Sequence, residues 1–365
     1  MNPESGPEPR PATSPRLAGL DALRGLLAVA VAAYHLSVWG GLFPGGTWAN
    51  MALARLGNYG VSAFFVLSGF ILARLSPWER LRREGLGAWW RKRFLRLAPL
   101  FYVAVGLNLA FGLGMGPDFS WRFLAENLSL SFGLFHPNHA FVTGGWYVGL
   151  VALAYAAWPL AAWLDRGRGW PLLLLCALLG AWSLGPTLHG VMALPHWERF
   201  HAYVLPGNQL FLVALGAAGG WLHGRIGARL PGPVVLLLGL ACLGWLVRRV
   251  PTFYDHFEVL TGWARYTYVS AGAGLVFLAA ATRSPLGVTG RVLGRLGSWS
   301  FGIYLLHPFA YRLVSPWAKG WTAFLGALLL SLAAGAAAER WIERPLGRLG
   351  RGQPDRTGAG GGPQA

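Results

Sequence analysis

The stretch LAGLDALRGLLAVAVAAYHLSVW, Leu17–Trp39, decides how this chain folds. It is long and apolar enough to cross a bilayer as a helix, yet it contains Arg24 and His35. These two residues are eleven positions apart, which at about 100° per residue returns to within roughly 20° of the same helix face. Both side chains are therefore expected on one face, separated by about 16 Å along the helix axis.

Ionisable side chains inside a membrane span are costly, and they usually face a protein interior or a wet cavity. The guanidinium of Arg24 suits a phosphate or a carboxylate, and the imidazole of His35 can carry a proton near neutral pH. The alternative is a structural helix in which Arg24 snorkels to the interface and His35 bonds a neighbouring helix. The position of the two residues on one face favours a functional pair.

The composition of the whole chain is that of an integral membrane protein. Of 365 residues, 54% are hydrophobic and 12% are charged. Ten runs are long enough to cross a bilayer, at about 18–40, 57–75, 97–114, 144–164, 170–187, 207–223, 232–248, 263–282, 297–314 and 321–341. None of them alternates with a period of two residues. We therefore expect an all-α, polytopic membrane bundle of about ten transmembrane helices.

The net charge of +17 follows the expected topology rather than a nucleic-acid site. If successive loops alternate between the two sides of the membrane, one side has Arg10, Arg16, the segment 74–96, Arg166, Arg168, Arg225, Arg229, Arg283, Arg291, Arg295 and the segment 340–356. The other side has only Arg55, Arg122, Arg199, Arg248, Arg249, Arg265, Arg312 and Lys319. The positive-inside rule then makes both termini cytoplasmic, in a multi-pass protein of the cell (inner) membrane. Nucleic-acid binding is not expected.

The chain is expected to form one membrane domain over residues 17–347, with disordered cytoplasmic tails at 1–16 and 348–365. The first span has no obvious cleavage site, so we expect a retained anchor rather than a signal peptide. Cys176 and Cys242 each fall in an apolar run and are interpreted as packing residues. No metal, haem or P-loop spacing occurs, so neither a metal site nor a bound cofactor is expected.

Six segments occur in an order that resembles the membrane acyltransferase 3 family. They are Leu20–Gly25 with His35, then Gly60–Phe70, Arg91–Pro99, Asn127–Leu128 with Gly145, Trp146, Tyr155 and Pro159, then Ser298–Pro308 and Glu339–Pro345. The resemblance extends from about residue 17 to 347. It implies transfer of an acyl group, typically acetyl, from cytoplasmic acyl-CoA to a hydroxyl of an extracytoplasmic saccharide or cell-envelope polymer.

The resemblance also suggests residues for the acyl-CoA donor. Arg91, Arg93 and Arg96 lie at the cytoplasmic mouth of the third span, and guanidinium groups suit the phosphates of CoA because they are planar and bidentate. Arg93 and Arg96 are three residues apart and share a helix face. The alternative is that these residues are ordinary positive-inside anchors of the span.

His35 is the expected general base, and Arg24 is its expected partner in catalysis, held by Asp21. A positioned imidazole that takes the proton of a sugar hydroxyl accelerates attack by roughly 10²–10⁴. The tetrahedral oxyanion then needs hydrogen-bond donors, for which Ser68, Trp146, Tyr304 and His307 are candidates. Packing is the alternative role for Trp146.

One position departs from the family pattern, because Val151 stands where relatives usually have a Glu five residues after the Trp. A carboxylate there would be expected to orient His35 or make it more basic. Two other functions therefore stay open. One is a saccharide or lipid transporter or flippase that uses the same polar cavity without chemistry, and the other is an inactive relative that acts as a scaffold.

Overall fold

The computed structural model describes residues 18–43, 47–112, 119–189, 194–227, 229–249, 262–282 and 287–350. Within these ranges the regular structure is helical, apart from one isolated bridge between Leu230 and Thr282. The long helices are α1 (Ala18–Trp39), α2 (Trp48–Leu75), α4 (Leu86–Ala110), α7 (Trp146–Asp165), α8 (Trp170–His189), α10 (Pro206–Ile226), α11 (Gly232–Arg249), α12 (Gly262–Ala281), α13 (Gly287–Val314) and α14 (Gly320–Ala338). Shorter helices are α3 (Trp78–Glu84), α5 (Trp121–Ser129), α6 (Phe132–Phe135), η1 (Pro137–His139), α9 (His196–Val204), the π-helix η4 (Glu339–Glu343) and α15 (Arg344–Leu349).

Each apolar run predicted from the sequence coincides in large part with one long helix, so the all-helical class is confirmed. Six helical segments are long and apolar enough to cross a membrane: Ala18–Trp39, Trp48–Leu75, Leu86–Ala110, Trp146–Asp165, Glu198–Ile226 and Gly320–Leu349. Shorter apolar stretches occur in α8, α11 and α12. The described residues thus support six candidate spans, and the count of ten stays a prediction. The predicted tail 1–16 and most of the tail 348–365 lie outside the described residues.

Helix α4 joins the basic segment and the third apolar run into one continuous element. It begins at Leu86, well before the predicted start of the run at residue 97, and contains Pro99 in its interior. Arg93 and Arg96 are therefore carried on the same helix that continues into the apolar core. The packing of α4 against its neighbours therefore decides which way the Arg93 and Arg96 side chains point.

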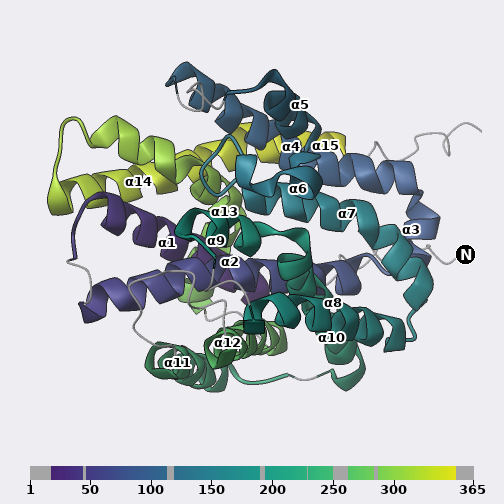
Figure 1. Cartoon of the computed structure of the whole chain (residues 1–365). Helices are drawn as coiled ribbons and strands as arrows, with labels where there is room; N and C mark the ends of the chain where they lie inside the picture. The colour runs from purple at the N-terminus through teal and green to yellow at the C-terminus, as the bar shows by residue number, and fades with distance from the viewer. Residues whose placement is uncertain are drawn as a thin grey trace, which may run out of the picture.

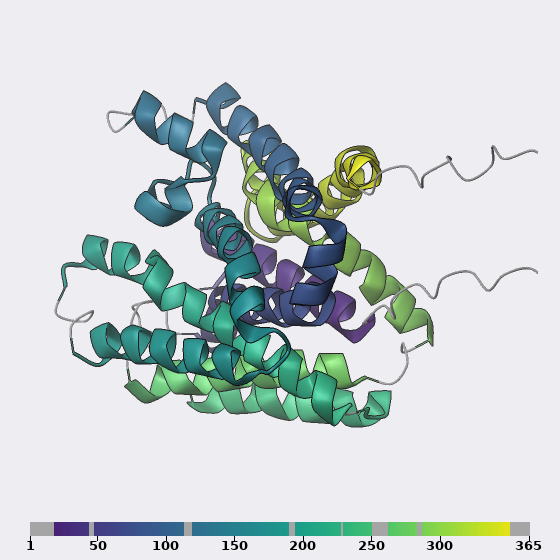
Figure 2. The same ribbon diagram turned by 90° about the vertical axis from the view of Figure 1, so that its right-hand side faces the viewer.

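The bundle has α1 and α2 at its centre. Figure 1 shows these helices running through the middle, with α4, α5 and α15 along one edge and α10, α11 and α12 along the other. Figure 2 shows the same separation after a turn of 90°, with blue α4 and yellow α15 above and α10, α11 and α12, in shades of green, below. Helix α1 packs most extensively against α13, and α2 against α10. Arg24 and His35 on α1 and Ser68 on α2 thus lie on the central helices, whereas Arg91, Arg93 and Arg96 are carried by α4 at the edge.

Glycines allow the central helices to touch backbone to backbone. A Cβ added to Gly25 of α1 would lie 2.6 Å from the backbone nitrogen of Gly297 in α13, and a Cβ on Gly297 would lie 2.0 Å from the Asp21 carbonyl oxygen. The same occurs between α2 and α10, where Cβ atoms on Gly69 and Gly216 would each lie 1.8 Å from a carbonyl oxygen of the other helix. Small residues at helix crossings permit this close approach in membrane bundles.

The crossing of α1 and α13 predicts a sharp difference between two glycines of α13. Gly297→Val must push α13 away from α1, and we expect a cost of about 3 kcal/mol or more from this overpacking. Gly294→Val should be tolerated, because a Cβ at Gly294 meets no atom within 4 Å. Size-exclusion profiles and melting temperatures of detergent-extracted variants measure the difference. Equal yields and melting temperatures for the two variants would contradict this packing.

Candidate active site

A pocket beside α1 gathers three arginines from distant parts of the sequence. It contains about 710 Å³ of space outside the protein atoms, including its open mouth, and its walls come from α1, α2, α4, α7 and α13. Arg24, Arg93 and Arg96 line it together with the hydroxyl-bearing Ser68, Tyr147, Tyr155, Ser300 and Tyr304, and the rest of the lining is apolar. The structure thus brings Arg24 together with two of the three arginines predicted to bind acyl-CoA.

Aromatic and hydroxyl groups hold Arg93 in place. Its Nη2 donates to Ser76 Oγ at 2.9 Å, and its guanidinium carbon lies 5.3 Å from the ring centroid of Trp89 and 5.1 Å from that of Tyr155. These contacts fix the direction of the guanidinium plane. Arg24 is held less tightly, because its Nη1 lies 3.5 Å from Asp21 Oδ1, in the ion pair that the sequence predicts.

Arg91 lies apart from the pocket. Its guanidinium donates to the carbonyl oxygen of Leu349 at the end of α15, on the exposed surface of the protein. The neighbouring Lys92 forms an ion pair of 2.7 Å with Glu84. The sequence prediction placed Arg91 with the CoA-binding arginines, but its side chain leaves α4 on another face and joins α4 to the C-terminal helix.

His35 forms a hydrogen bond with a second histidine that is 272 positions away in the sequence. His35 Nδ1 and His307 Nε2 are 2.9 Å apart, and the two rings are coplanar within 3° with centroids 5.0 Å apart. That centroid distance fits an in-plane hydrogen bond rather than face-to-face stacking. Trp39 lies nearly parallel to both rings, 5.2 Å from His35 and 5.6 Å from His307 between centroids. His307 is fully buried.

A backbone carbonyl determines which ring nitrogens of this pair carry the protons. His307 Nδ1 lies 2.8 Å from the Tyr304 carbonyl oxygen, which can only accept, so His307 carries its proton on Nδ1. A neutral His307 then accepts at Nε2, and His35 must donate its Nδ1 proton to it. This tautomer leaves His35 Nε2 as the lone-pair nitrogen, which is the atom that a general base needs.

The other predicted oxyanion donors divide between the pocket and the protein core. Ser68 and Tyr304 line the pocket. Ser68 Oγ lies 3.1 Å from the hydroxyl of Tyr147, a pocket residue that the sequence interpretation did not single out. Trp146 instead packs between Phe65 and Tyr203, with ring centroids 5.8 Å and 5.3 Å away. Packing, the alternative role for Trp146, fits this geometry.

Tyr304 forms the wall between the arginine pocket and the histidine pair. Its side chain lines the pocket, while its carbonyl oxygen accepts from His307. The hydroxyl donates to the Gly144 carbonyl oxygen at 2.8 Å, just before α7. Gly144 has a φ of +78°, and a Cβ there would lie 2.9 Å from the Tyr304 hydroxyl oxygen. Only glycine both adopts this conformation easily and leaves room for the tyrosine.

Val151 lies in the wall of the arginine pocket and is 2% exposed. In relatives, a Glu at this position would be expected to orient His35. In the structure that orienting hydrogen bond comes from His307 of α13 instead. The imidazole of His35 therefore has a partner without a carboxylate at position 151.

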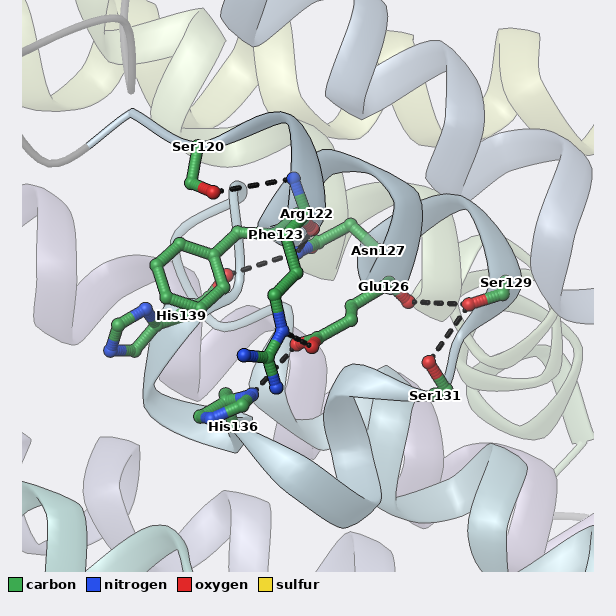
Figure 3. A network of polar contacts seen from close by, with 9 residues as sticks. All are labelled: Ser120, Arg122, Phe123, Glu126, Asn127, Ser129, Ser131, His136 and His139. Carbon is green, nitrogen blue, oxygen red and sulfur yellow. Dashed lines mark hydrogen bonds and ion pairs between the residues drawn. The ribbon is translucent and has the colours of Figure 1, made fainter.

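A polar network secures the segment between α4 and α7, as Figure 3 shows. Glu126 of α5 accepts from Arg122 Nε at 2.9 Å and is paired with His136 Nδ1 at 2.8 Å. Asn127 bridges the same segment, donating to the His139 carbonyl oxygen at 3.0 Å and accepting from the Phe141 amide at 3.0 Å. This network holds the chain that leads to Gly144, and so it supports the position of Tyr304.

The charge on Glu126 should make this network sensitive to acid. Burial alone would raise the pKa of Glu126, but the hydrogen bonds from His136 and Arg122 outweigh burial and hold the pKa below its ordinary value of 4.5. The stabilisation is therefore fully present above about pH 4.5 and is lost as the pH falls through the lowered pKa.

Glu126→Gln should accordingly lower the melting temperature by a few degrees at neutral pH, and the loss should shrink as the pH falls through the lowered pKa of Glu126, where the wild-type carboxylate also becomes protonated. Glu79→Gln is the control, because Glu79 forms only an exposed ion pair of 3.7 Å with Arg82. Melting curves of the three proteins between pH 3 and 7 provide the comparison. A pH-independent loss in Glu126→Gln would show that the ionised carboxylate contributes nothing.

Comparison with known proteins identifies the family of this chain. The acyltransferase domain family, acyltransferase 3, matches residues 17–340. The chain belongs to this family. The match covers α1 to α14, so both the arginine pocket and the histidine pair lie within the acyltransferase domain.

Two relatives are themselves named as acyltransferases. Acyltransferase MdmB of Streptomyces mycarofaciens is 29% identical over 379 residues, which cover 94% of this chain and 95% of that protein. Peptidoglycan O-acetyltransferase OatA of Listeria monocytogenes is 25% identical over 333 residues, covering 81% of this chain and 50% of that enzyme. The chain thus spans about half the length of the Listeria protein. No solved structure matches the chain.

Proposed function

We propose that this protein transfers an acetyl group from cytoplasmic acyl-CoA to a hydroxyl of an extracytoplasmic saccharide or cell-envelope polymer. One observation carries the proposal: helix α1 presents Arg24 to a pocket with two further arginines, and His35 to a buried imidazole farther along the same helix. The names of the relatives support O-acetyl transfer, and that of the Listeria enzyme supports a cell-wall polymer as acceptor.

The orientation in the membrane follows from the distribution of basic residues. We propose ten spans with both termini in the cytoplasm. The N-terminal half of α4, with Arg93 and Arg96, then lies on the cytoplasmic side of the cell membrane. The phosphates of CoA would bind these two guanidinium groups, and the acyl-pantetheine arm would extend past Arg24 toward Tyr304. His35 lies near the other end of α1, where a saccharide can approach from outside.

In the proposed reaction, His35 Nε2 removes the proton of the acceptor hydroxyl as the oxygen attacks the thioester carbonyl carbon. His307 keeps His35 in the required tautomer and shares the charge of the imidazolium that forms. Arg24, Ser68 and Tyr304 line the route and can stabilise the tetrahedral oxyanion. Its collapse breaks the carbon–sulfur bond and forms the ester, and the imidazolium returns its proton to the CoA thiolate. Tyr304 must move during the reaction cycle, because it lies between the arginine pocket and the histidine pair.

The donor site predicts that Arg93 and Arg96 differ from Arg91. Arg93→Gln and Arg96→Gln should each raise the apparent KM for acetyl-CoA by about 10-fold, the effect of losing one charge-assisted contact, and Lys should rescue only in part. Arg91→Gln is the matched control, because Arg91 comes from the same helix but lies outside the pocket. Steady-state transfer kinetics in membranes measure this. An equal effect of all three Gln variants on the KM would show that Arg93 and Arg96 do not bind CoA specifically and are membrane anchors instead.

The base assignment predicts a graded series at the histidine pair. His35→Ala should lower kcat by about 10²–10⁴ with little change in the KM for acetyl-CoA. His307→Gln should retain part of the activity, because its amide oxygen can accept the His35 Nδ1 proton, whereas His307→Phe should not. In the wild type, kcat should fall at acidic pH as His35 becomes protonated.

Radiolabelled acetyl transfer with folded, quantified variants checks this series. Near wild-type transfer by His35→Ala would show that another group removes the proton. Saccharide movement without release of CoA would instead support a transporter, and neither activity in the wild type would support a scaffold.

A further inference from the structure

A second arginine is buried in another part of the bundle, and no carboxylate of the described residues pairs with it. Arg265 of α12 is only 2% exposed, and none of the ion pairs among the described residues includes it. Its Nη2 donates to Ser183 Oγ of α8 and to the Asn208 carbonyl oxygen of α10, the latter at 3.1 Å. Within the part of the chain that the structure describes, its Nε and Nη1 have no hydrogen-bond acceptor. A buried cation in a membrane bundle is costly and is a candidate functional group.

Unsatisfied acceptors accompany these unsatisfied donors. Asn208 and Gln209, in the first turn of α10, are 3% and 2% exposed. Their amide nitrogens donate to the carbonyl oxygens of Ala202 at 2.5 Å and Tyr203 at 2.7 Å, but no described residue donates to Asn208 Oδ1 or Gln209 Oε1. Buried polar atoms are nearly always hydrogen-bonded, so donors and acceptors left over in one place indicate a polar occupant.

The cluster adjoins the proposed transfer centre from the acceptor side. Tyr203 lies beside Ser62 and within electrostatic range of Arg265, and its ring is 5.3 Å from that of Trp146. Trp146 precedes Tyr147, which lines the arginine pocket. Arg265, Asn208 and Gln209 all lie within the first turn of their helices, at the end that the proposed topology makes extracytoplasmic. The cluster and His35 thus lie toward the same side of the membrane.

We infer that Arg265, Asn208 and Gln209 form a buried subsite for an acidic saccharide. A carboxylate of the acceptor would bind the Nε and Nη1 donors of Arg265, and hydroxyl groups of the sugar would donate to the two amide oxygens. A neutral sugar would leave the guanidinium uncompensated, and a simple anion would leave the amide oxygens unsatisfied. This inference rests on the proposed function and specifies the class of acceptor.

The experiment compares two ligands that differ only in charge. Methyl glucuronide, with a carboxylate, and methyl glucuronamide, its neutral amide, are added to the purified full-length protein in detergent, and the melting temperature is recorded. We expect the acid to raise the melting temperature by several degrees more than the amide does. Arg265→Gln should abolish this difference, and Arg265→Lys should retain part of it because a cation remains.

Arg199→Gln is the matched control, because Arg199 lies on α9 near this region and its Nε donates to the Leu194 carbonyl oxygen. It should retain the wild-type preference for the acid. Equal stabilisation of the wild type by acid and amide, or an unchanged preference in Arg265→Gln, would overturn the inference.

A transfer assay separates this inference from the proposed function. With radiolabelled acetyl-CoA and cell-envelope glycan, His35-dependent transfer in the absence of any charge preference would leave the proposed function intact and remove only the acidic subsite. In the same assay, Arg265→Gln should raise the KM for an acidic glycan by about 10-fold, and the control Arg199→Gln should leave this KM unchanged.

Discussion

An ionisable side chain in the middle of a membrane protein must face other protein groups or water, and α1 carries two of them. Arg24 and His35 point into the bundle from the helix that α13 and α2 enclose. The distance between them is set by a rigid helix, about 16 Å along the axis. Because Gly25 and Gly297 bring α1 and α13 into backbone contact, His307 can reach His35 while Tyr304 borders the pocket that contains Arg24. The packing of one helix pair therefore positions Arg24, His35 and Tyr304 relative to one another.

The wall at Tyr304 has consequences for the chemistry. The hydrogen bond from Tyr304 to Gly144 fixes the tyrosine in the wall of the arginine pocket, and the network around Glu126 and Asn127 holds the loop that supplies the Gly144 carbonyl. The bond is a single neutral hydrogen bond, worth about 1 kcal/mol net, so it can break when Tyr304 moves. In the proposed reaction, access of the acceptor to the thioester thus depends on this tyrosine.

The sequence predicts much of the fold because long apolar runs leave helices as the only suitable element. Helical periodicity alone also predicts that Arg24 and His35 share a face. The partner of His35 could not be predicted, because His307 is 272 positions away and depends on the crossing of α13 with α1. Arg91 and Arg93 look alike in the sequence, but positions two apart on α4 differ by about 200° around the helix, so Arg91 reaches the surface and Arg93 the pocket. In the sequence, Arg265 is only one of the charges near the end of an apolar run, and nothing there shows that its guanidinium is buried.

In the proposed reaction, donor and acceptor reach the site from opposite sides of the membrane. Sealed vesicles of known orientation, with glycan acceptor in the lumen and radiolabelled acetyl-CoA outside, distinguish this arrangement from transfer on one side. Inside-out vesicles, whose cytoplasmic face is exposed, should label the lumenal glycan, and Arg93→Gln and His35→Ala should each reduce the label. Right-side-out vesicles should label no glycan until they are permeabilised. Labelling from acetyl-CoA on the extracytoplasmic face of intact vesicles, or labelling only of glycan on the same side as the donor, would contradict transfer across the bundle.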